Sequence, residues 1–323
     1  MTQRLRWAIL GTGTVARRFA AALRNIADQA DLVAVGSRQQ ATADAFGDQY
    51  GIRWRYASYE QVAANPDVDV VYIGTPHEYH RRDAAMCLEL GKHVLCEKAF
   101  TVNAREAGEL IHLARRRNLF LMEAMWTRFF PIHVHLRELL AEGVLGSLGG
   151  LTVHHNYTAG SDPPGTYERR LGMGTFLDQA PYGVGFGHSL LGPVEAVAGL
   201  ATFSPQGANL QAAYILRHAA DRLTTVINSR VTVDVKEAIV YGSRGKIHIH
   251  DPWYKPSTLT VFLEGQAPQR VHLPLNGFIG YEYEALAVTE CLRQGQTECD
   301  VMPLDATLAT LQVMDQIRQQ WTL

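Results

Sequence analysis

The first 123 residues alternate between short apolar runs and longer amphipathic stretches. Five apolar runs have the length and composition of buried strands, at residues 7–10, 32–36, 68–74, 93–96 and 119–123. Five stretches between them are typical of helices, at residues 15–26, 40–50, 59–64, 80–90 and 101–117. This regular alternation predicts an α/β fold with a doubly wound parallel sheet.

The pattern becomes β-rich after Trp126. Two predicted helices accompany this part, at residues 130–142 and 175–191, and two more close the chain, at 281–294 and 305–319. The predicted strands are residues 151–157, 194–203, 211–217, 223–231, 238–241, 246–250 and 259–263. Hairpin-like gaps join several of them, so we predict an α+β domain with a large, mostly antiparallel sheet. The expected domains are residues 1–124 and 125–323.

The segment RLRWAILGTGTVA, from Arg4 to Ala16, combines the first strand with a glycine-rich turn. Gly11, Gly13 and Ala16 have the G-x-G-x-x-A spacing of a dinucleotide-binding loop. Gly11 would permit the tight turn, Gly13 would let the backbone approach a pyrophosphate, and Ala16 would let the helix pack closely on the strand. The helix N-terminus would then face the phosphates. A chance turn of small residues is the alternative, but the flanking strands and helix favour a dinucleotide site.

The end of the second strand indicates which dinucleotide is bound. An acidic residue about 20 positions after the glycines would bind the ribose 2′-hydroxyl and favour NAD. Here Ser37 and Arg38 occupy that place, and Asp31 comes too early. A hydroxyl and a guanidinium suit a 2′-phosphate, so we predict NADP over NAD. The alternative is that Arg38 is a solvated surface residue.

Composition and charge limit the possible partners and compartment. The chain of 323 residues is 47% hydrophobic and 19% charged, with a formal net charge of −2, which gives no reason to expect nucleic acid or a membrane as partner. No apolar run is long enough to span a membrane, and the first strand begins too early for a targeting segment. The four cysteines form no C-x-x-C pair, so we expect reduced thiols and a cytoplasmic protein. His248 and His250 lack a third ligand nearby, so we expect no metal site.

Several chemically useful residues follow the predicted parallel strands. Gly11, Ser37, Thr75, Lys98 and Glu123 all fall at carboxyl ends of strands, where ligands of such sheets bind, so one groove should collect them. An ammonium at Lys98 could bind the nicotinamide ribose and a substrate hydroxyl, and could stabilise a developing alkoxide. A solvated loop lysine is the alternative.

Asp178 and Tyr182 form a second candidate pair, four residues apart in a predicted helix and therefore on one face. A carboxylate and a phenol near a lysine make a plausible proton-transfer set, because a nearby cation lowers the pKa of tyrosine. An ordinary polar helix face is the alternative. Pro181 lies between them and is tolerated in the first turn of a helix, which indicates a helix start near Asp178.

The segment MEAMWTRFFP, residues 122–131, is an aromatic-rich crossover between the two predicted domains. Trp126 and Arg128 could face the nicotinamide end of the groove. Packing alone is the alternative explanation for the aromatic residues.

Together these residues resemble the glucose-fructose oxidoreductase / inositol dehydrogenase / MocA-like family. The resemblance covers essentially the whole chain and rests on the segments AILGTGTVA, GTPHEYH, LCEKAF, FLMEAMWTRF, GMGTFLDQAPYG and YGSRGKIHI. Within the family, FLMEAMWTRFFP and EKAF are most similar to the dimeric dihydrodiol dehydrogenases and NADP-linked xylose dehydrogenases. The resemblance implies a Rossmann domain, an open-faced β-sheet domain used for dimerisation, and hydride transfer between NADP and a secondary alcohol or hemiacetal carbon.

The resemblance also assigns catalytic residues. The lysine of the family's E-K-P motif corresponds to Lys98. The acidic and aromatic residues of its second motif, G-G-x-x-x-D-x-x-x-[YH], correspond to Asp178 and Tyr182. Ala99 replaces the usual proline, which removes a rigid restraint on the Lys98 loop. A second difference from the family's pattern lies just before Tyr182. The chain has Gln-Ala-Pro there, ending at Pro181, where the family more often has an apolar residue and glycine.

The sequence therefore predicts an NADP-dependent oxidoreductase, expected as a homodimer, that acts on a sugar, polyol or cyclic diol. Either Tyr182 or Lys98 would take the hydroxyl proton, Asp178 would orient the substrate or its catalytic partner, and residues 159–170 would line the pocket. Two alternatives are a non-catalytic dinucleotide-sensing regulator and a biliverdin-type or imine reductase on the same scaffold. The predicted cofactor-binding residues are Gly11, Thr12, Gly13, Thr14, Val15, Ser37, Arg38, Thr75, Pro76, His80, Glu97, Lys98, Trp126 and Arg128.

Overall fold

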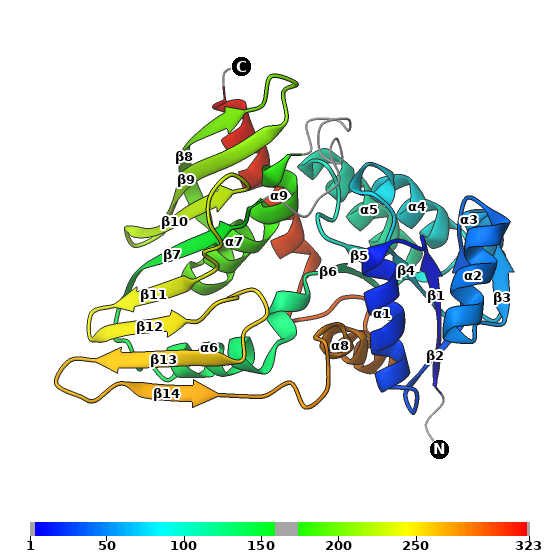
Figure 1. The fold of residues 1–323 in the computed structure, drawn as a ribbon, viewed down its shortest axis with the longest axis horizontal. Coiled ribbons are helices and arrows are strands. Elements are labelled where there is room, and N and C mark those ends of the chain that lie inside the picture. The colour runs from blue at the N-terminus through cyan, green and yellow to red at the C-terminus, as the bar shows by residue number, and fades with distance from the viewer. Residues whose placement is uncertain (1–3, 159–173, 322–323) are drawn as a thin grey trace. The chain divides into compact units, whose positions relative to one another are not determined.

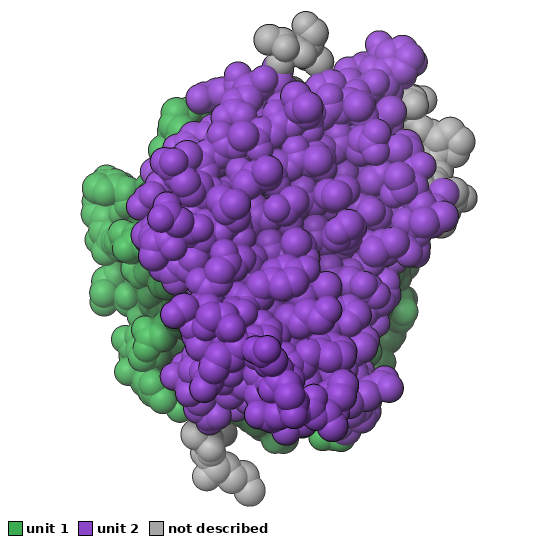
Figure 2. All heavy atoms as spheres, turned by 90° about the vertical axis from the view of Figure 1, so that its left-hand side faces the viewer, with its two compact units in different colours: residues 1–129, 276–308 green, residues 130–275, 309–323 purple. Residues whose placement is uncertain are grey.

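A computed structural model describes residues 4–158 and 174–321 of the chain. The chain divides into two compact units, coloured separately in Figure 2: unit 1, with residues 1–129 and 276–308, and unit 2, with residues 130–275 and 309–323. The expected domain division at residues 124 and 125 stays a prediction, because compactness alone does not establish independent folding. The predicted pocket-lining residues 159–170 lie outside the described residues.

Unit 1 contains a six-stranded parallel sheet in the order β3-β2-β1-β4-β5-β6 (Figure 1), which confirms the predicted doubly wound sheet. Its strands are β1 (Leu5–Leu10), β2 (Ala30–Gly36), β3 (Trp54–Tyr56), β4 (Val70–Ile73), β5 (His93–Glu97) and β6 (Leu121–Ala124). Its helices are α1 (Thr14–Asn25), α2 (Gln40–Tyr50), α3 (Tyr59–Ala64), α4 (His77–Glu89), α5 (Ala104–Arg117), the 3₁₀ helix η1 (Trp126–Phe129) and α8 (Tyr281–Arg293). The short edge strand β3 was not expected from the sequence.

Strand β1 lies at the point where the strand order reverses, between β2 and β4. Its last four residues, Trp7 to Leu10, are fully buried. Helix α1 packs beside it, and the ring of Phe19 stacks on that of Tyr72 in β4 with centroids 3.8 Å apart. A reversal of strand order opens a crevice at the carboxyl ends of the strands, so this edge is the expected ligand site.

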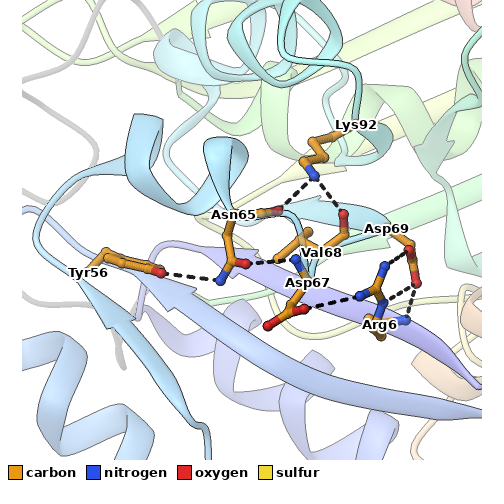
Figure 3. Close-up of polar contacts among 7 residues, drawn as sticks. All are labelled: Arg6, Tyr56, Asn65, Asp67, Val68, Asp69 and Lys92. Atoms are coloured by element: carbon orange, nitrogen blue, oxygen red, sulfur yellow. Dashed lines mark hydrogen bonds and ion pairs between the residues drawn. The ribbon is translucent and has the colours of Figure 1, made fainter.

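The amino ends of the same strands carry a structural ion-pair network (Figure 3). The guanidinium of Arg6 binds both carboxylate oxygens of Asp69, at 2.7 and 3.0 Å, and Lys92 donates to the carbonyl groups of Asn65 and Val68, at 2.8 Å each. Burial raises the pKa of Asp69, but the hydrogen bonds and charge of Arg6 outweigh it and hold that pKa below its usual value. These polar residues therefore join the beginnings of β1, β4 and β5, at the edge opposite the expected site.

Unit 2 contains an eight-stranded sheet in the order β14-β13-β12-β11-β7-β10-β9-β8 (Figure 1). Its strands are β7 (Leu148–Asn156), β8 (Val194–Phe203), β9 (Asn209–His218), β10 (Arg222–Ser229), β11 (Ala238–Gly242), β12 (Gly245–Ile249), β13 (Thr258–Leu263) and β14 (Gln269–His272). Its helices are α6 (Pro131–Ala141), α7 (Thr175–Leu191) and the part of α9 (Leu304–Gln319) from Ala309 onward. The prediction of a mostly antiparallel sheet is confirmed, with one parallel pair, β7 and β10.

Helix α7 packs against β7, β9 and β10 and is buried along most of its length. Its observed bounds confirm the predicted range 175–191, and the later start near Asp178 suggested by Pro181 is wrong. Pro181 lies inside the helix, where it cannot donate the usual backbone hydrogen bond. Burial of the surrounding apolar residues offsets that loss, because tertiary packing supplies most of the stability of a helix in a protein.

All four cysteines are buried free thiols. His248 and His250 have rings 4.5 Å apart on β12 and the residue after it, and across residues 4–158 and 174–321 no group of three or more His, Cys, Asp or Glu side chains could hold a metal ion. In the same residues, no helix has both the length and the apolar character needed to cross a membrane.

Candidate active site

The glycine-rich loop after β1 has two glycines with different structural demands. Gly11 has φ +97°, and a Cβ there would lie 2.8 Å from the carbonyl oxygen of Gly74, so the fold itself requires glycine. A Cβ at Gly13 would meet no protein atom within 4 Å. The packing of the protein therefore does not explain Gly13, whereas close approach of a pyrophosphate would.

Helix α1 begins at Thr14, directly after this loop. Its N-cap residue is Gly13, and no side chain caps the helix by a hydrogen bond. The first backbone N–H groups of a helix need acceptors from outside the helix, and the helix dipole favours an anion there. Thr12 lies in the loop and Thr14 and Val15 are the first residues of the helix, and their contact with a diphosphate stays a prediction.

Ser37 and Arg38 follow β2 at the same edge of the sheet. Ser37 is buried, its hydroxyl group contacts that of Thr42, and its backbone N–H donates to the carbonyl group of Tyr56. Arg38 is exposed. An exposed cation thus follows a buried hydroxyl group directly along the chain, and the contact of both with a 2′-phosphate stays a prediction.

Lys98 lies in the turn after β5, and several contacts hold that turn. The carboxylate of Glu97 accepts hydrogen bonds from the phenol of Tyr72, at 2.5 Å, and from the backbone N–H of Lys98, at 3.1 Å. Nε2 of His77 lies 3.0 Å from the carbonyl oxygen of Lys98, and Nδ1 of His80 lies 2.9 Å from that of Ala99. The peptide bond between Lys98 and Ala99 is cis. The turn is therefore held by side chains from both β4 and α4.

The loop after β4 carries Thr75 and Pro76, and His80 lies in the first turn of α4. The Thr75 hydroxyl group donates to Asp83 at 2.8 Å, and Pro76 is the N-cap residue of α4. His80 is fully buried, and both of its ring nitrogens lie against backbone carbonyl groups. A role for His80 in cofactor binding stays a prediction, and the burial indicates that such a role is indirect.

Unit 1 also buries three carboxyl groups that sequence reasoning did not bring together: Glu97, Glu123 and Glu284. Burial raises the pKa of Glu123 to about 7, although hydrogen bonds from Thr307 and from the Phe100 N–H favour its charged form. Burial also raises the pKa of Glu284 well above its usual value, and the charges of Glu97 and Glu123 add to that shift. Glu123 was visible as a strand-end residue, whereas Glu284 lies on α8, a predicted helix whose sequence contains no site motif.

Trp126 and Arg128 lie in η1, directly after β6. Trp126 is largely buried and stacks on Tyr281 of α8, with ring centroids 4.5 Å apart. Arg128 is half-buried and donates to the carbonyl group of Val301 at 3.1 Å. Both residues thus have structural contacts inside unit 1, and their contact with a nicotinamide stays a prediction.

Asp178 and Tyr182 lie one turn apart on α7 in unit 2, whereas Lys98 belongs to unit 1. The phenol of Tyr157 donates to Oδ2 of Asp178 at 3.2 Å, and the guanidinium of Arg230 lies 4.9 Å from the centre of the Tyr157 ring. This hydrogen bond fixes the direction of the carboxylate. Neither Tyr157 nor Arg230 was identified from the sequence.

Tyr182 is flanked by aromatic side chains from elsewhere in unit 2. Its ring centroid lies 5.4 Å from that of His155, 5.8 Å from that of Tyr254 and 6.4 Å from that of Trp253. His155 and Tyr254 stack in parallel at 4.8 Å. Only 8% of the surface of Tyr182 is exposed, so its ring is part of a largely buried wall of rings.

Two family models match the chain. Residues 5–125 match a model described as an oxidoreductase family with an NAD-binding Rossmann fold, and residues 133–248 match the GFO/IDH/MocA C-terminal domain. The Homo sapiens trans-1,2-dihydrobenzene-1,2-diol dehydrogenase is 32% identical over 330 residues, which cover 98% of this chain and 96% of the human protein. The Danio rerio protein of the same name is 33% identical over 325 residues, with coverage of 98% and 96%.

Solved structures share the fold at lower identity. KijD10, a 3-ketoreductase from Actinomadura kijaniata in complex with NADP and TDP-benzene, superposes with a TM-score of 0.88 at 21% identity, covering 99% of this chain and 98% of its own. Aldose-aldose oxidoreductase from Caulobacter crescentus, complexed with glycerol, gives a TM-score of 0.87 at 24% identity, with coverage of 98% and 97%. Both comparisons support the fold assigned above.

Proposed function

Because the chain belongs to the GFO/IDH/MocA family of oxidoreductases, we propose that it is an NADP-dependent dehydrogenase or reductase acting on a CH–OH group of a sugar, polyol or cyclic diol. One observation carries this proposal. In a chain that matches dihydrodiol dehydrogenases almost from end to end, Asp178 and Tyr182 lie one helical turn apart, and Tyr157 orients the carboxylate. Such a preorganised carboxylate and phenol suit proton transfer at a hydroxyl group.

The residues of the chain would divide the reaction between them. The bound dinucleotide supplies a hydride acceptor in oxidation and a hydride donor in reduction. Tyr182 or Lys98 would take the hydroxyl proton during oxidation, and Asp178 would orient the substrate or its catalytic partner. An ammonium group at Lys98 would stabilise the developing alkoxide by its charge.

The cofactor preference rests on Ser37 and Arg38. The open space at Gly13 and the uncapped N-terminus of α1 fit the diphosphate, and the exposed guanidinium of Arg38 fits a 2′-phosphate. An Arg38→Gln variant should lose about 10- to 150-fold in NADP affinity, the value of a hydrogen bond to a charged group, and keep its NAD affinity. Titration of both dinucleotides by tryptophan fluorescence measures this. Equal affinity of the wild type for NAD would contradict the assignment of Ser37 and Arg38.

The wall of rings around Tyr182 supports a cyclic substrate. Trp253 is fully buried and His155 largely so, whereas the ring of Tyr254, which stacks on that of His155, is half-buried and can pack against the C–H face of a sugar or diol ring. Asp178 and Tyr157 place hydrogen-bonding groups beside these rings, as a hydroxylated ring requires.

The decisive experiment is a turnover screen with purified protein. Pyranoses, inositols and cyclic diols are each offered with NADP, and the corresponding ketones with NADPH, while the nicotinamide absorbance is followed. We expect turnover with one of these substrate classes. Tight NADP binding without turnover in either direction would contradict an enzyme and favour a dinucleotide sensor, whereas turnover of imines or tetrapyrroles alone would favour the other reductase chemistry.

We also propose that the protein is a cytoplasmic homodimer, joined through one face of the eight-stranded sheet. On this face Leu200, Ile215 and Leu223 are 80%, 44% and 46% exposed. The registers place Leu200 opposite Ala213 and Leu223 opposite Arg217, which are the neighbours of Ile215 on the same face of β9. An exposed apolar patch of this kind is typical of a protein–protein interface. The cytoplasm fits the four buried thiols, which stay reduced there.

A further inference from the structure

His80 bridges two backbone carbonyl groups from different parts of unit 1. Its Nε2 lies 2.7 Å from the carbonyl oxygen of Thr75, in the loop after β4, and its Nδ1 lies 2.9 Å from that of Ala99, in the turn after β5. The side chain is fully buried. One imidazole ring thus contacts both the loop after β4 and the turn after β5, and the second of these carries Lys98.

The chemistry of the ring restricts how both contacts can be made. A neutral imidazole has one N–H donor and one bare nitrogen, whereas an imidazolium has two N–H donors. Carbonyl oxygens only accept, so both contacts are hydrogen bonds only when both ring nitrogens carry protons. In the neutral form, one nitrogen lone pair would face a carbonyl oxygen, and that link would be lost.

One buried carboxylate near the ring of His80 favours its protonated form. Asp83 follows His80 by three residues on α4, is buried, and accepts hydrogen bonds from the Thr75 hydroxyl group and from Arg82. The ring of His77 meets that of His80 edge-on at 5.4 Å, and Glu97 and Lys98 lie in the adjoining turn. Burial lowers the pKa of His80 and outweighs the carbonyl groups of Thr75 and Ala99 and the charge of Asp83, so the pKa stays below its usual value and the imidazolium form belongs to the acid side.

We propose that His80 is a positioning residue for Lys98, and that its imidazolium form ties Thr75 to Ala99 and so fixes the turn that carries the lysine. The inference rests on the proposed catalytic role of Lys98. His77, one turn earlier on α4, contacts the carbonyl oxygen of Lys98 itself, so two histidines from successive helical turns bind successive carbonyl groups. As the pH rises and His80 loses its proton, one of its two links opens, and the turn is held less firmly.

The state of the ring can be measured directly on the wild-type protein. In ¹⁵N-histidine-labelled protein, the ring-nitrogen shifts of His80 are followed from about pH 5 to about pH 8, the range in which histidines titrate. We expect two protonated nitrogens at the acid end, loss of one proton as the pH rises, and a parallel rise in amide hydrogen exchange around Phe100. A ring with one bare nitrogen over the whole range would overturn the proposal.

Kinetics of a variant provide the second test. His80→Asn keeps a single donor group, its NH₂, and does not titrate. It should lower kcat by up to about 100-fold, as a misplaced catalytic group does, with a smaller change in NADPH affinity and an altered pH profile. His112→Asn, at an exposed position of α5, is the matched control and should behave as the wild type. A wild-type kcat and pH profile in His80→Asn would also overturn the proposal.

The two measurements separate this inference from the proposed function. If the wild type turns over no substrate, the proposed function fails, while the NMR titration and hydrogen exchange still decide whether His80 bridges the two carbonyl groups. If His80→Asn does not fold, the wild-type titration alone decides, with the ring assigned through its contact with His77.

Discussion

The phenol of Tyr72 donates a 2.5 Å hydrogen bond to Oε1 of Glu97, while Oε2 of the same carboxylate accepts the backbone N–H of Lys98. Tyr72 is fully buried in β4, and Glu97 is the last residue of β5. Burial raises the pKa of Tyr72 well above its usual value, and Glu97 adds to that shift, so the phenol keeps its proton and donates at neutral pH. The link therefore supports the Lys98 turn from within the sheet.

Removing this donor should destabilise the protein. Tyr72→Phe leaves a carboxylate oxygen of Glu97 buried without the phenol, which costs about 1–3 kcal/mol in the free energy of unfolding. Urea denaturation measures the loss. Tyr50→Phe is the control, because its phenol donates to the carbonyl group of Arg17 at an exposed position and should cost less than about 0.5 kcal/mol. Equal stability of the two variants would contradict a supporting role for Tyr72.

The two glycines of the loop after β1 should respond differently to alanine. Gly11→Ala forces a side chain to φ +97° and against the carbonyl oxygen of Gly74, so it should cost about 1–3 kcal/mol of stability even without cofactor. Gly13→Ala meets no protein atom within 4 Å and should leave the unfolding curve unchanged while weakening NADPH binding. Chemical denaturation and a fluorescence titration of each variant test this pair. Wild-type NADPH affinity in Gly13→Ala would exclude the pyrophosphate from this loop.

Glu123 should make the protein less stable as the pH rises. Its pKa increases from 4.5 to about 7 on folding, so between these values the folded state binds the proton that the unfolded state has lost. Stability falls as the pH rises through this window. Glu123→Gln removes the titration, and the fall in unfolding free energy between about pH 5 and about pH 8 should shrink by about 1–3 kcal/mol. Denaturation curves at both pH values measure it, and an unchanged pH dependence in Glu123→Gln would contradict this contribution.

Substitution of the proposed catalytic groups should lower turnover without preventing cofactor binding. Lys98→Met and Tyr182→Phe should each lower kcat by about 100-fold or more, the contribution of a positioned proton-transfer group, and leave NADPH affinity within a few-fold of the wild type. Tyr241→Phe is the control in unit 2, because its exposed phenol contacts only the hydroxyl group of Thr152 among the hydrogen bonds described for it. Substantial turnover in Lys98→Met would remove the lysine from the mechanism.

The regular part of the fold could be predicted because its strands are continuous apolar runs or alternate clearly. The strands that escaped prediction lack this signal. Residues Trp54–Tyr56 of β3 are only half-buried, and Gln269 and Arg270 of β14 are exposed. Each becomes a strand by pairing with a neighbour, β2 or β13, at the edge of its sheet. The strand propensity of their residues does not determine such edge strands. They form because a neighbouring strand pairs with them.

The candidate site could be predicted where a motif is local. Gly11, Gly13 and Lys98 were identified because each follows a strand that the sequence marks clearly. Tyr157 and Arg230 were missed, because they meet only through the parallel pairing of β7 with β10, where Tyr157 donates its backbone N–H to the carbonyl group of Ser229. That register depends on contacts between distant segments, which neither spacing nor composition encodes.

A charge on the exposed face of the eight-stranded sheet should test the proposed homodimer. Ile215 is 44% exposed in β9 and lies opposite Ala198 of β8 and Thr225 of β10. Ile215→Lys places an ammonium group in the apolar patch, and burying it in an interface would cost more than the contact gains. Light scattering after gel filtration should therefore find the wild type dimeric and the variant monomeric. The free energy of unfolding of the monomer should change by less than about 0.5 kcal/mol. Val134→Lys changes an equally apolar, 39% exposed residue on α6 and should remain dimeric. A dimeric Ile215→Lys variant would place the interface elsewhere, and a monomeric wild type would exclude the homodimer.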